Sequence, residues 1–246
     1  MPEGPSIVIL KEAAQNYVGK KIIQASGNSK KIDFGRLLGT KIIALKSWGK
    51  HFLICFPDFT IRIHFLMFGS YLINEEKETS SPRLSIRFSK SSVLNFYACA
   101  INTIEKPLDE VYDWTADVMN KNWDSKKALT KLNALPETLA CDALLDQQIF
   151  SGVGNIIKNE VLFRIRVHPK SKIGKLPPAK KRELIKEAVH YSFQFMEWKK
   201  DFVLKRHWLA HTKKICPRDH VPIVKKYLGR TNRRTFYCKV CQKLYN

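Results

Sequence analysis

The pattern of apolar residues changes near residue 120, and this change constrains the fold more than any other feature of the sequence. Before it, short β-rich runs alternate with turn residues, as at residues 51–56 and 84–88. After it come longer segments with helical periodicity, such as residues 155–164 and 178–200. Closely spaced short strands are typical of a β-sandwich or barrel, whereas the later pattern is typical of helices. We therefore predict an α+β protein whose strands and helices occupy separate domains.

The first half is expected to form a β-sandwich domain with one leading helix. Apolar residues fall on one face of residues 5–17, which is the pattern of an amphipathic helix. The β-rich runs cover residues 22–23, 41–45, 51–56, 60–65, 70–73, 84–88 and 93–97. Helices are expected at about residues 125–135, 138–150, 155–164 and 178–200. The predicted domains are residues 1–122, 123–209 and 210–246.

The charge of the chain indicates its partners. Lysine and arginine number 43 against 22 acidic residues, which gives a formal net charge of +21. Such a surface attracts polyanions, so DNA or RNA is the expected partner, and a basic protein with no specific partner is the alternative. No apolar run is long enough to span a bilayer, and no basic amphipathic helix suggests membrane binding. The first residues lack the features of a signal peptide, so we expect an intracellular protein.

Three of the six cysteines lie in a basic C-terminal segment and predict a zinc finger. Cys238 and Cys241 form a C-x2-C pair, and Cys216 begins a second ligand pair that lacks its second cysteine. Either His220 or Asp219 supplies the fourth ligand, and we favour His220 because imidazole is the commoner partner of thiolates in zinc sites. A unit this small has little core without the ion. The alternative is a site that has lost its metal. The other cysteines lie in apolar surroundings and are expected in the core: Cys55, Cys99 and Cys141.

Pro2 suggests covalent chemistry at the start of the chain. Methionine is normally removed before so small a residue, which would leave a secondary amine at the N-terminus. This amine can attack C1′ of a deoxyribose and form an iminium ion, which acidifies the C2′ hydrogen and promotes loss of the 3′ phosphate. Glu3 is adjacent and can act as a general acid or base. Proline at this position is common, so this feature alone carries little weight.

A glycine-containing turn joins two predicted helices at Gly152 and Gly154. Glycine allows the backbone to approach a ligand closely, and the amides at the start of the next helix favour phosphate. Asn155 can cap that helix and also contact a phosphate oxygen. An ordinary helical hairpin is the alternative interpretation of the glycines alone.

Four separated motifs resemble the formamidopyrimidine-DNA glycosylase and endonuclease VIII family, and together they cover essentially the whole chain. They are Met1-Pro2-Glu3-Gly4-Pro5, Gly49-Lys50-His51-Phe52, Ser151-Gly152-Val153-Gly154-Asn155 with Asn159-Glu160, and Arg233-Arg234-Thr235-Phe236-Tyr237-Cys238. The four motifs in this order are highly specific. The resemblance implies a helix-two-turn-helix domain and a bifunctional glycosylase and abasic-site lyase of base excision repair. Its partner would be double-stranded DNA that contains an oxidised base or an abasic site.

The resemblance also implies roles for individual residues. Pro2 would be the nucleophile, Glu3 the acid or base near the ribose ring oxygen, and Lys50 a catalytic contact to phosphate. Met67 would fill the space left by the extruded base. The remaining implied DNA contacts are Gly154, Asn155, Lys158 and Arg233. A structural Zn²⁺ would be held by Cys216, His220, Cys238 and Cys241.

Several departures from the family pattern bear on the substrate. Ser6 replaces a glutamate that many members carry, and residues 97–103 lack the Arg-x-Phe wedge of purine-specific members. Residues 198–214 contain no glycine and are predicted to be largely helical, so they would not cover an extruded base easily. We therefore expect oxidised pyrimidines to be favoured, with β,δ-elimination at the resulting abasic site. A preference for 8-oxoguanine or formamidopyrimidine is one alternative.

Two other function classes remain open. The first is a catalytically silent protein that binds damaged DNA on the same scaffold. The second is a basic RNA-binding protein with a zinc ribbon, which would explain the charge but neither the Pro2-Glu3 start nor the glycine turn. For the favoured enzyme we expect a monomer in a bacterial cytoplasm, associated with the nucleoid.

Overall fold

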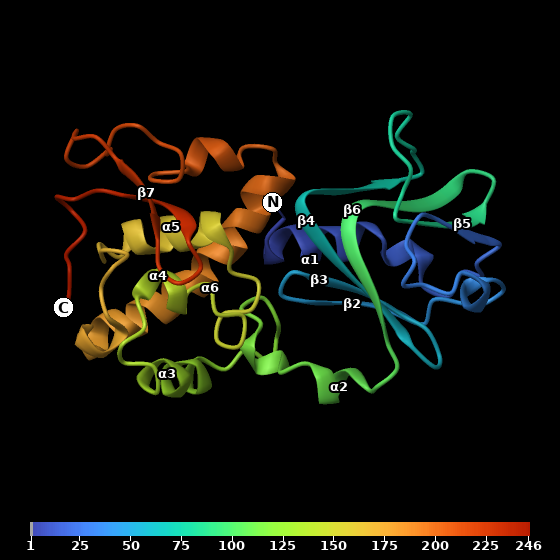
Figure 1. Cartoon of the computed structure of the whole chain (residues 1–246), viewed down its shortest axis with the longest axis horizontal. Helices are drawn as coiled ribbons and strands as arrows, with labels where there is room; N and C mark the ends of the chain where they lie inside the picture. Colours follow the sequence, from blue (N-terminus) through green and yellow to red (C-terminus); the bar gives the residue numbers. More distant parts are fainter. Residues whose placement is uncertain (1) are drawn as a thin grey trace. The chain divides into compact units, whose positions relative to one another are not determined.

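The structure is a computed structural model that describes residues 2–246. It divides the chain into two compact units, of which the first ends at Tyr112 and the second begins at Asp113. Strands of one large sheet build the first unit, and helices with a C-terminal hairpin build the second (Figure 1). The α+β class predicted from the change in periodicity is therefore confirmed.

The boundary precedes residue 113 instead of following residue 122, because the intervening segment packs on the helices. Val118 belongs to the buried core of the second unit. The carboxylate of Asp113 accepts a hydrogen bond of 2.9 Å from the ammonium group of Lys131. A β-bridge joins Asp117 to Ser151. These contacts make residues 113–122 part of the helical unit.

An antiparallel sheet with the strand order β1-β5-β6-β4-β3-β2 forms the scaffold of the first unit. Its strands are β1 (Gln24–Ser26), β2 (Ala44–Trp48), β3 (His51–Cys55), β4 (Thr60–Ile73), β5 (Leu84–Ser89) and β6 (Ser92–Ile104). The predicted runs 60–65 and 70–73 merge into β4, and the run 93–97 extends into the longer β6. Residues 97–103 are therefore part of a strand.

A large bulge divides the pairing of β4 with β6 into two stretches. Phe65 lies opposite Cys99 and Ser70 lies opposite Tyr97, so the four residues 66–69 of β4 oppose Ala98 alone. Ala98 has a φ of 47°, in the left-handed region. Bulges of this kind bend a strand and release the extra residues from the ladder. The regular pairing on both sides keeps the bulge at a defined position.

The apolar core of the first unit lies between two layers of this bent sheet. The first half of β4 pairs with β3, whereas the first half of β6 pairs with β5. The rings of Phe52 on β3 and Phe96 on β6 have centroids 5.9 Å apart within one buried cluster. Helix α1 (Gly4–Ala13) adds Ile7 and Leu10 to this core, and the turn η1 (Gln15–Tyr17) follows it. The predicted sandwich with a leading helix is confirmed.

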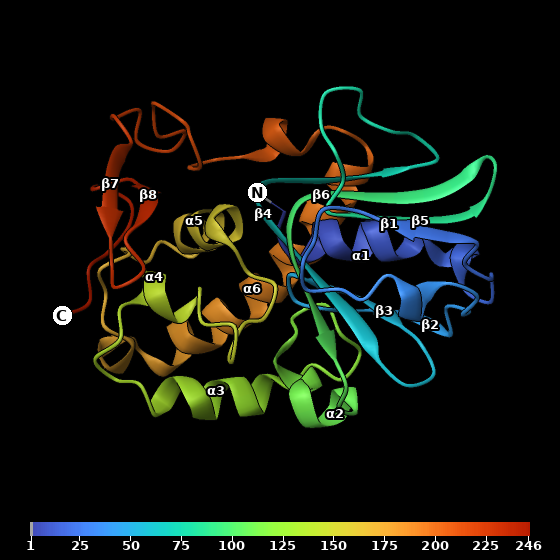
Figure 2. The same cartoon turned by 45° about the vertical axis from the view of Figure 1, so that its right-hand side comes forward.

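The short helix α2 (Leu108–Val111) ends the first unit, and the second unit contains the remaining helices and the hairpin (Figure 2). These elements are α3 (Ser125–Asn133), α4 (Ala140–Ala143), α5 (Asn155–Arg164), α6 (Pro178–Lys200), β7 (Val224–Leu228) and β8 (Arg233–Tyr237). Helices α5 and α6 cover the residue ranges predicted for them. In the part of the chain that the structure describes, no helix is long and apolar enough to cross a bilayer.

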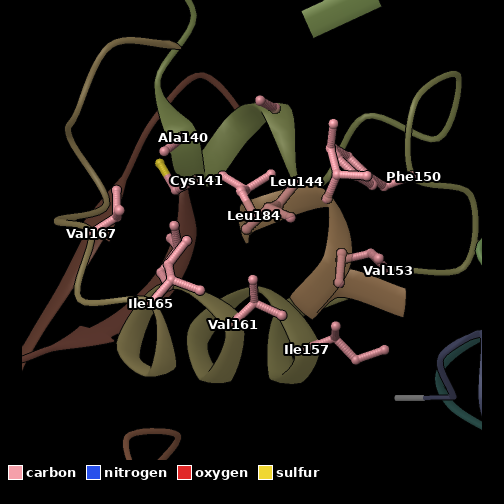
Figure 3. Close-up of a cluster of buried hydrophobic side chains, with 14 of the residues drawn as sticks. Ala140, Cys141, Leu144, Phe150, Val153, Ile157, Val161, Ile165, Val167 and Leu184 are labelled. Atoms are coloured by element: carbon pink, nitrogen blue, oxygen red, sulfur yellow. The ribbon is translucent and has the colours of Figure 1, made fainter. Parts of the chain in front are cut away.

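The core of the second unit surrounds α5. Ile157 and Val161 of this helix lie in one buried cluster with Leu184 of α6 (Figure 3). Phe163, on the same helix, belongs to a separate small cluster with Phe236 of the terminal hairpin. The predicted domains 123–209 and 210–246 therefore share α5 as a packing partner. The three cysteines expected in the core are buried: Cys55, Cys99 and Cys141.

The helix predicted over residues 138–150 is wrong beyond Ala143. Residues 144–150 form turns, and polar side chains bond to the backbone within them. The carboxylate of Asp146 accepts a bond from the backbone N–H of Gln148, and the amide of Gln147 bonds to the carbonyls of Leu145 and Val153. Polar side chains that bond to nearby backbone compete with helix formation in this way.

Residues 198–214 also differ from the prediction that they are largely helical. Helix α6 ends at Lys200, and the turn η5 (Leu204–His207) is followed by turns and irregular chain. The segment nevertheless has defined contacts, since the rings of Trp198 and His207 stack with centroids 4.1 Å apart.

Candidate active site and nucleic-acid interface

The start of the chain places a carboxylate beside the first turn of α1. Pro2 is half-buried and extended chain leads directly into the helix at Gly4. Glu3 occupies the N-cap position and is only 1% exposed, which is unusual for a glutamate. The positive end of the helix dipole favours a negative charge at this position. Pro2 and Glu3 thus lie together at the end of a fixed helix, while Met1 is outside the described residues.

Lys50 lies in a tight hairpin turn between β2 and β3. Trp48 pairs with His51, which leaves Gly49 and Lys50 as a two-residue connection. Gly49 has a φ of 51°, and glycine at the first position of such a turn is the usual solution for this backbone geometry. The lysine is therefore presented on one of the shortest and most constrained connections that a hairpin allows.

Aromatic and imidazole rings support this turn. The Tyr112 hydroxyl lies 3.2 Å from Nδ1 of His51, and the Trp48 and Tyr112 rings have centroids 4.9 Å apart. Burial lowers the pKa of His51 to about 3, with further lowering by the nearby His64 and by cationic side chains. Burial and the charge of Lys50 lower the pKa of His64 as well. Both imidazoles are therefore neutral at pH 7, and Lys50 supplies positive charge above an uncharged support.

Met67 lies in the bulge of β4, where it is 59% exposed. Its neighbours Leu66 and Phe68 are 50% and 84% exposed, so three large apolar side chains reach solvent in succession. The sequence-based prediction named only Met67. An exposed apolar run on a highly charged protein is typical of a binding surface.

The start of α5 and the strand β8 are tied together by polar side chains. The Asn155 amide nitrogen donates to the carbonyl of Arg234 at 2.9 Å. The Lys158 ammonium donates to Oδ1 of Asn155 at 2.9 Å and to Oγ1 of Thr235 at 2.8 Å. Gly154 is the N-cap of α5. The exposed Arg233, which precedes Arg234, is therefore held beside the N-terminus of α5.

Lys158 differs from its predicted role. Its side chain is fully buried and holds Asn155 and Thr235 instead of reaching solvent. A buried ammonium group needs such partners because its loss of hydration is costly. Lys158 is thus a positioning residue for Asn155, and the prediction of a direct DNA contact is corrected.

Asn159 and Glu160, which the sequence identified only as part of a motif, also hold distant segments. Asn159 accepts a bond from the backbone N–H of Phe236 on β8. The Glu160 carboxylate accepts bonds of 2.7 to 2.9 Å from the backbone N–H groups of residues 209–211. Burial raises the pKa of Glu160, and these three donors oppose the shift. One face of α5 therefore fixes both the hairpin and the segment that leads to it.

Asp142 anchors the tip of the hairpin, and no sequence motif identified it. Its carboxylate accepts bonds from the backbone N–H groups of Arg230 and Thr231 and from the Thr231 hydroxyl, at 2.9 to 3.3 Å. Gly229 permits this approach, since a Cβ atom there would lie 2.4 Å from a carboxylate oxygen of Asp142. The turn that precedes Arg233 is thus fixed from α4.

A cluster of potential metal ligands lies at the base of the hairpin. One ligand atom from each of Cys216, Asp219, Cys238 and Cys241 lies within 4.8 Å of all the others. Oδ2 of Asp219 is 3.3 Å from Sγ of Cys216 and 3.2 Å from Sγ of Cys238. Three thiolates and one carboxylate form a donor set that suits a four-coordinate metal ion.

Among the described residues this cluster includes Asp219 and not His220, which corrects our preference between the two. His220 is exposed, has a φ of 55°, and donates its backbone N–H to the carbonyl of Cys216. The backbone turn that begins at Cys216 thus brings the residue three positions later to the thiols. The spacing is that of a normal zinc knuckle with aspartate in the place of the second cysteine.

The comparisons with known proteins agree with this geometry. The family description "Formamidopyrimidine-DNA glycosylase N-terminal domain" matches residues 1–98, and "Formamidopyrimidine-DNA glycosylase H2TH domain" matches residues 115–195. Human endonuclease 8-like 2 is 32% identical over an alignment of 197 residues, with coverage of 74% of this chain and 57% of that protein. Endonuclease 8-like 3 of Bos taurus is 30% identical over 241 residues, covering 94% of this chain and 40% of that protein. The chain thus spans 57% and 40% of the length of these two relatives.

Solved structures show the same fold. The crystal structure of a viral DNA glycosylase has a TM-score of 0.86, 23% identity, and coverage of 98% of this chain and 100% of its own. Lactococcus lactis formamidopyrimidine-DNA glycosylase, bound to DNA that contains an abasic site, has a TM-score of 0.84, 20% identity, and coverage of 98% and 99%. The fold is the one that formamidopyrimidine-DNA glycosylases share, with its N-terminal and H2TH domains. The chain belongs to the formamidopyrimidine-DNA glycosylase and endonuclease VIII family.

The neutral support beneath Lys50 predicts a loss of stability in acid. Because the pKa of His51 falls from 6.5 to about 3 on folding, the unfolded chain takes up a proton between these values that the native state does not. The contribution of His51 to the free energy of unfolding is fully present above pH 6.5. Below pH 6.5 this contribution falls by at most ~1.4 kcal/mol per pH unit. Urea unfolding at pH 7.5 and 5.5 measures this change. His51→Gln should lose less stability between the two values than the wild type, and an equal loss would contradict the assignment.

The anchor on the hairpin tip predicts a local effect of Asp142. Asp142→Ala should accelerate hydrogen exchange at the backbone amides of Arg230 and Thr231 by ~10-fold or more, because their acceptor is removed. Peptide-resolved exchange measures it. Glu137→Ala, which removes an exposed carboxylate paired with Lys172, is the control and should leave these amides unchanged. An unchanged exchange rate at these amides in Asp142→Ala would show that the turn keeps its conformation without the Asp142 carboxylate.

Proposed function

We propose that the protein is a bifunctional DNA glycosylase and abasic-site lyase of base excision repair. The observation that carries the proposal is the pair Pro2 and Glu3, with a buried carboxylate fixed at the head of α1 beside the prospective terminal amine. Family membership supports it, as do relatives named endonuclease 8-like proteins and a fold neighbour described as bound to an abasic site. A silent DNA-binding protein would not need these two residues together.

The chemistry follows from the amine of Pro2 once Met1 is removed. Its nitrogen lone pair attacks C1′, the bond from C1′ to the damaged base breaks, and the departing base takes up a proton from solvent. The Glu3 carboxylate accepts the N–H proton of the attacking amine and passes it to the ribose ring oxygen as the ring opens, which leaves an iminium ion on Pro2. Loss of the C2′ proton expels the 3′ phosphate, and a second elimination expels the 5′ phosphate. Water then hydrolyses the iminium and restores the amine.

Each unit offers phosphate contacts of its own. In the second unit, the N-terminus of α5 at Gly154 and Asn155 is suited to a phosphate through its backbone amides. Arg233 is exposed beside it and adds a cationic contact. In the first unit, Lys50 presents a charge on its rigid turn. We propose that each of these groups contacts the phosphate backbone of the DNA, with Lys158 and Asp142 positioning Asn155 and the hairpin within the second unit.

Extrusion of the base requires side chains that fill its place in the duplex. Met67 is the wedge in this proposal, and its exposed neighbours Leu66 and Phe68 flank it on the same bulge. They provide the apolar surface for the orphaned partner base, since residues 97–103 lie in β6 and carry no Arg-x-Phe wedge. The same feature supports a preference for oxidised pyrimidines. Activity on 8-oxoguanine or formamidopyrimidine is the alternative.

Zinc is the proposed structural ion of the hairpin. Cys216, Asp219, Cys238 and Cys241 fit a tetrahedral Zn²⁺ site, and the Arg218 guanidinium, 3.7 Å from Sγ of Cys241, offsets the negative charge of the ligands. The ion would stabilise the hairpin that presents Arg233 and would take no part in the reaction. We expect a monomer acting on damaged duplex DNA.

Borohydride trapping tests the nucleophile. Protein with its native N-terminus and a duplex with one abasic site should form a covalent adduct on reduction, and peptide mapping should place it at Pro2.

Pro2→Gly, which keeps a primary amine, should retain partial activity. Glu3→Gln should slow base excision by ~10²-fold or more but affect cleavage of a preformed abasic site less. Tight, salt-sensitive binding without any adduct would favour the silent DNA-binding protein.

Metal analysis tests the ligand set. The purified protein should contain about one zinc per chain by the tetrahedral-site argument. Asp219→Ala should lower zinc retention during dialysis against a chelator, and DNA affinity should fall with it. His220→Ala is the matched control and should retain the ion. The opposite result, with zinc lost only in His220→Ala, would restore histidine as the fourth ligand.

A further inference from the structure

Phe202, just beyond the end of α6, combines two unfavourable features. It is 96% exposed, which is more than any other large apolar side chain in the described chain. Its φ is 59°, in the left-handed region that bulky residues rarely occupy. The residue that follows a helix C-cap is usually glycine when the backbone turns this way. Neither ending the helix nor packing the core explains a phenylalanine here.

The turn that carries Phe202 is fixed by hydrogen bonds. The backbone N–H of Phe202 donates to the carbonyl of Lys199 at 3.2 Å, and that of Val203 donates to the carbonyl of Trp198 at 2.9 Å. The Trp198 ring then stacks on His207 with an angle of 3° between the planes. This stack joins the end of α6 to η5. The exposed ring of Phe202 therefore projects from a rigid backbone and not from a loose loop.

The surroundings of Phe202 are basic. Residues 197–206 contain the exposed cations Lys199, Lys200, Lys205 and Arg206 against the acids Glu197 and Asp201. An aromatic side chain among cations is the combination that binds single-stranded nucleic acid, because the ring stacks on a base while the cations contact phosphates. An apolar protein partner would be expected to meet an apolar patch instead.

We propose that Phe202 stacks on an unpaired nucleobase of the DNA substrate, while the flanking lysines and arginine contact phosphates of the same strand. This proposal rests on the proposed function and adds a contact that is separate from the apolar bulge of the first unit. Stacking reads no base identity, since every base offers a flat face. It requires only that a face be accessible, which an intact duplex does not provide. The contact should therefore favour single-stranded or locally opened DNA.

Three variants test the proposal by fluorescence anisotropy with a labelled single-stranded oligonucleotide and the matching intact duplex. Phe202→Gly should weaken single-strand binding by roughly 5- to 100-fold, the range expected for one lost base stack. Duplex binding should change by no more than about twofold, since the phosphate contacts remain. The Tm should equal or exceed that of the wild type, because glycine suits the left-handed backbone. Phe202→Trp should keep single-strand affinity.

Phe193→Ala is the matched control, because Phe193 is a partly exposed phenylalanine on α6 in ordinary helical conformation. It should leave both affinities unchanged. Unaltered single-strand binding by Phe202→Gly would overturn the proposal, as would an equal loss on the duplex or in Phe193→Ala. Borohydride trapping of the wild type is run in parallel. Absence of an adduct there would refute the lyase, whereas the single-strand comparison would still decide the role of Phe202.

Discussion

The ammonium group of Lys158 is buried between Asn155 and Thr235, and the geometry of the second unit depends on this contact. A buried ammonium group is tolerated only where hydrogen-bond acceptors replace its hydration. Because the acceptors of Lys158 lie on α5 and β8, these two elements must keep one relative position. Glu160 extends the same requirement to residues 209–211. Polar groups that would destabilise a core if unpaired thus act as specific links between the helices and the hairpin.

The first unit uses backbone geometry for the same purpose. A two-residue turn presents Lys50, and regular pairing on both sides of a bulge presents Met67. Both proposed DNA-contacting side chains lie where the strand pairing is interrupted, and the regular pairing on either side fixes the position of each interruption. Neutral imidazoles under the Lys50 turn keep additional positive charge away from that lysine at neutral pH. Lys50 and Met67 are therefore both presented on backbone that the neighbouring strand pairs hold in place.

Local patterns predicted the features that local forces control. The ranges of α5 and α6 follow from apolar periodicity, and the α+β division follows from the change in that periodicity. Features that depend on contacts far apart in the chain were not predictable. Asp142 meets the hairpin tip 88 residues later, and only the folded chain distinguishes Asp219 from His220 as the neighbour of the thiols. The helix expected over residues 138–150 failed because polar side chains bonded to the backbone.

The bulge in β4 separates the surface that the strand exposes from the pairing that holds the strand in the sheet. Regular pairing resumes at Ser70, and the side chains of residues 66–68 are exposed between the two paired stretches, so the register of the sheet does not depend on their identity. Gly69 is the exception, since a Cβ atom there would lie 2.7 Å from Cβ of Phe65 and 2.8 Å from the carbonyl oxygen of Ala98. Substitutions at residues 66–68 therefore change the exposed surface of the bulge and leave the paired stretches on both sides in register. Folding and the surface that this bulge exposes are thus largely independent properties of the strand at residues 66–68.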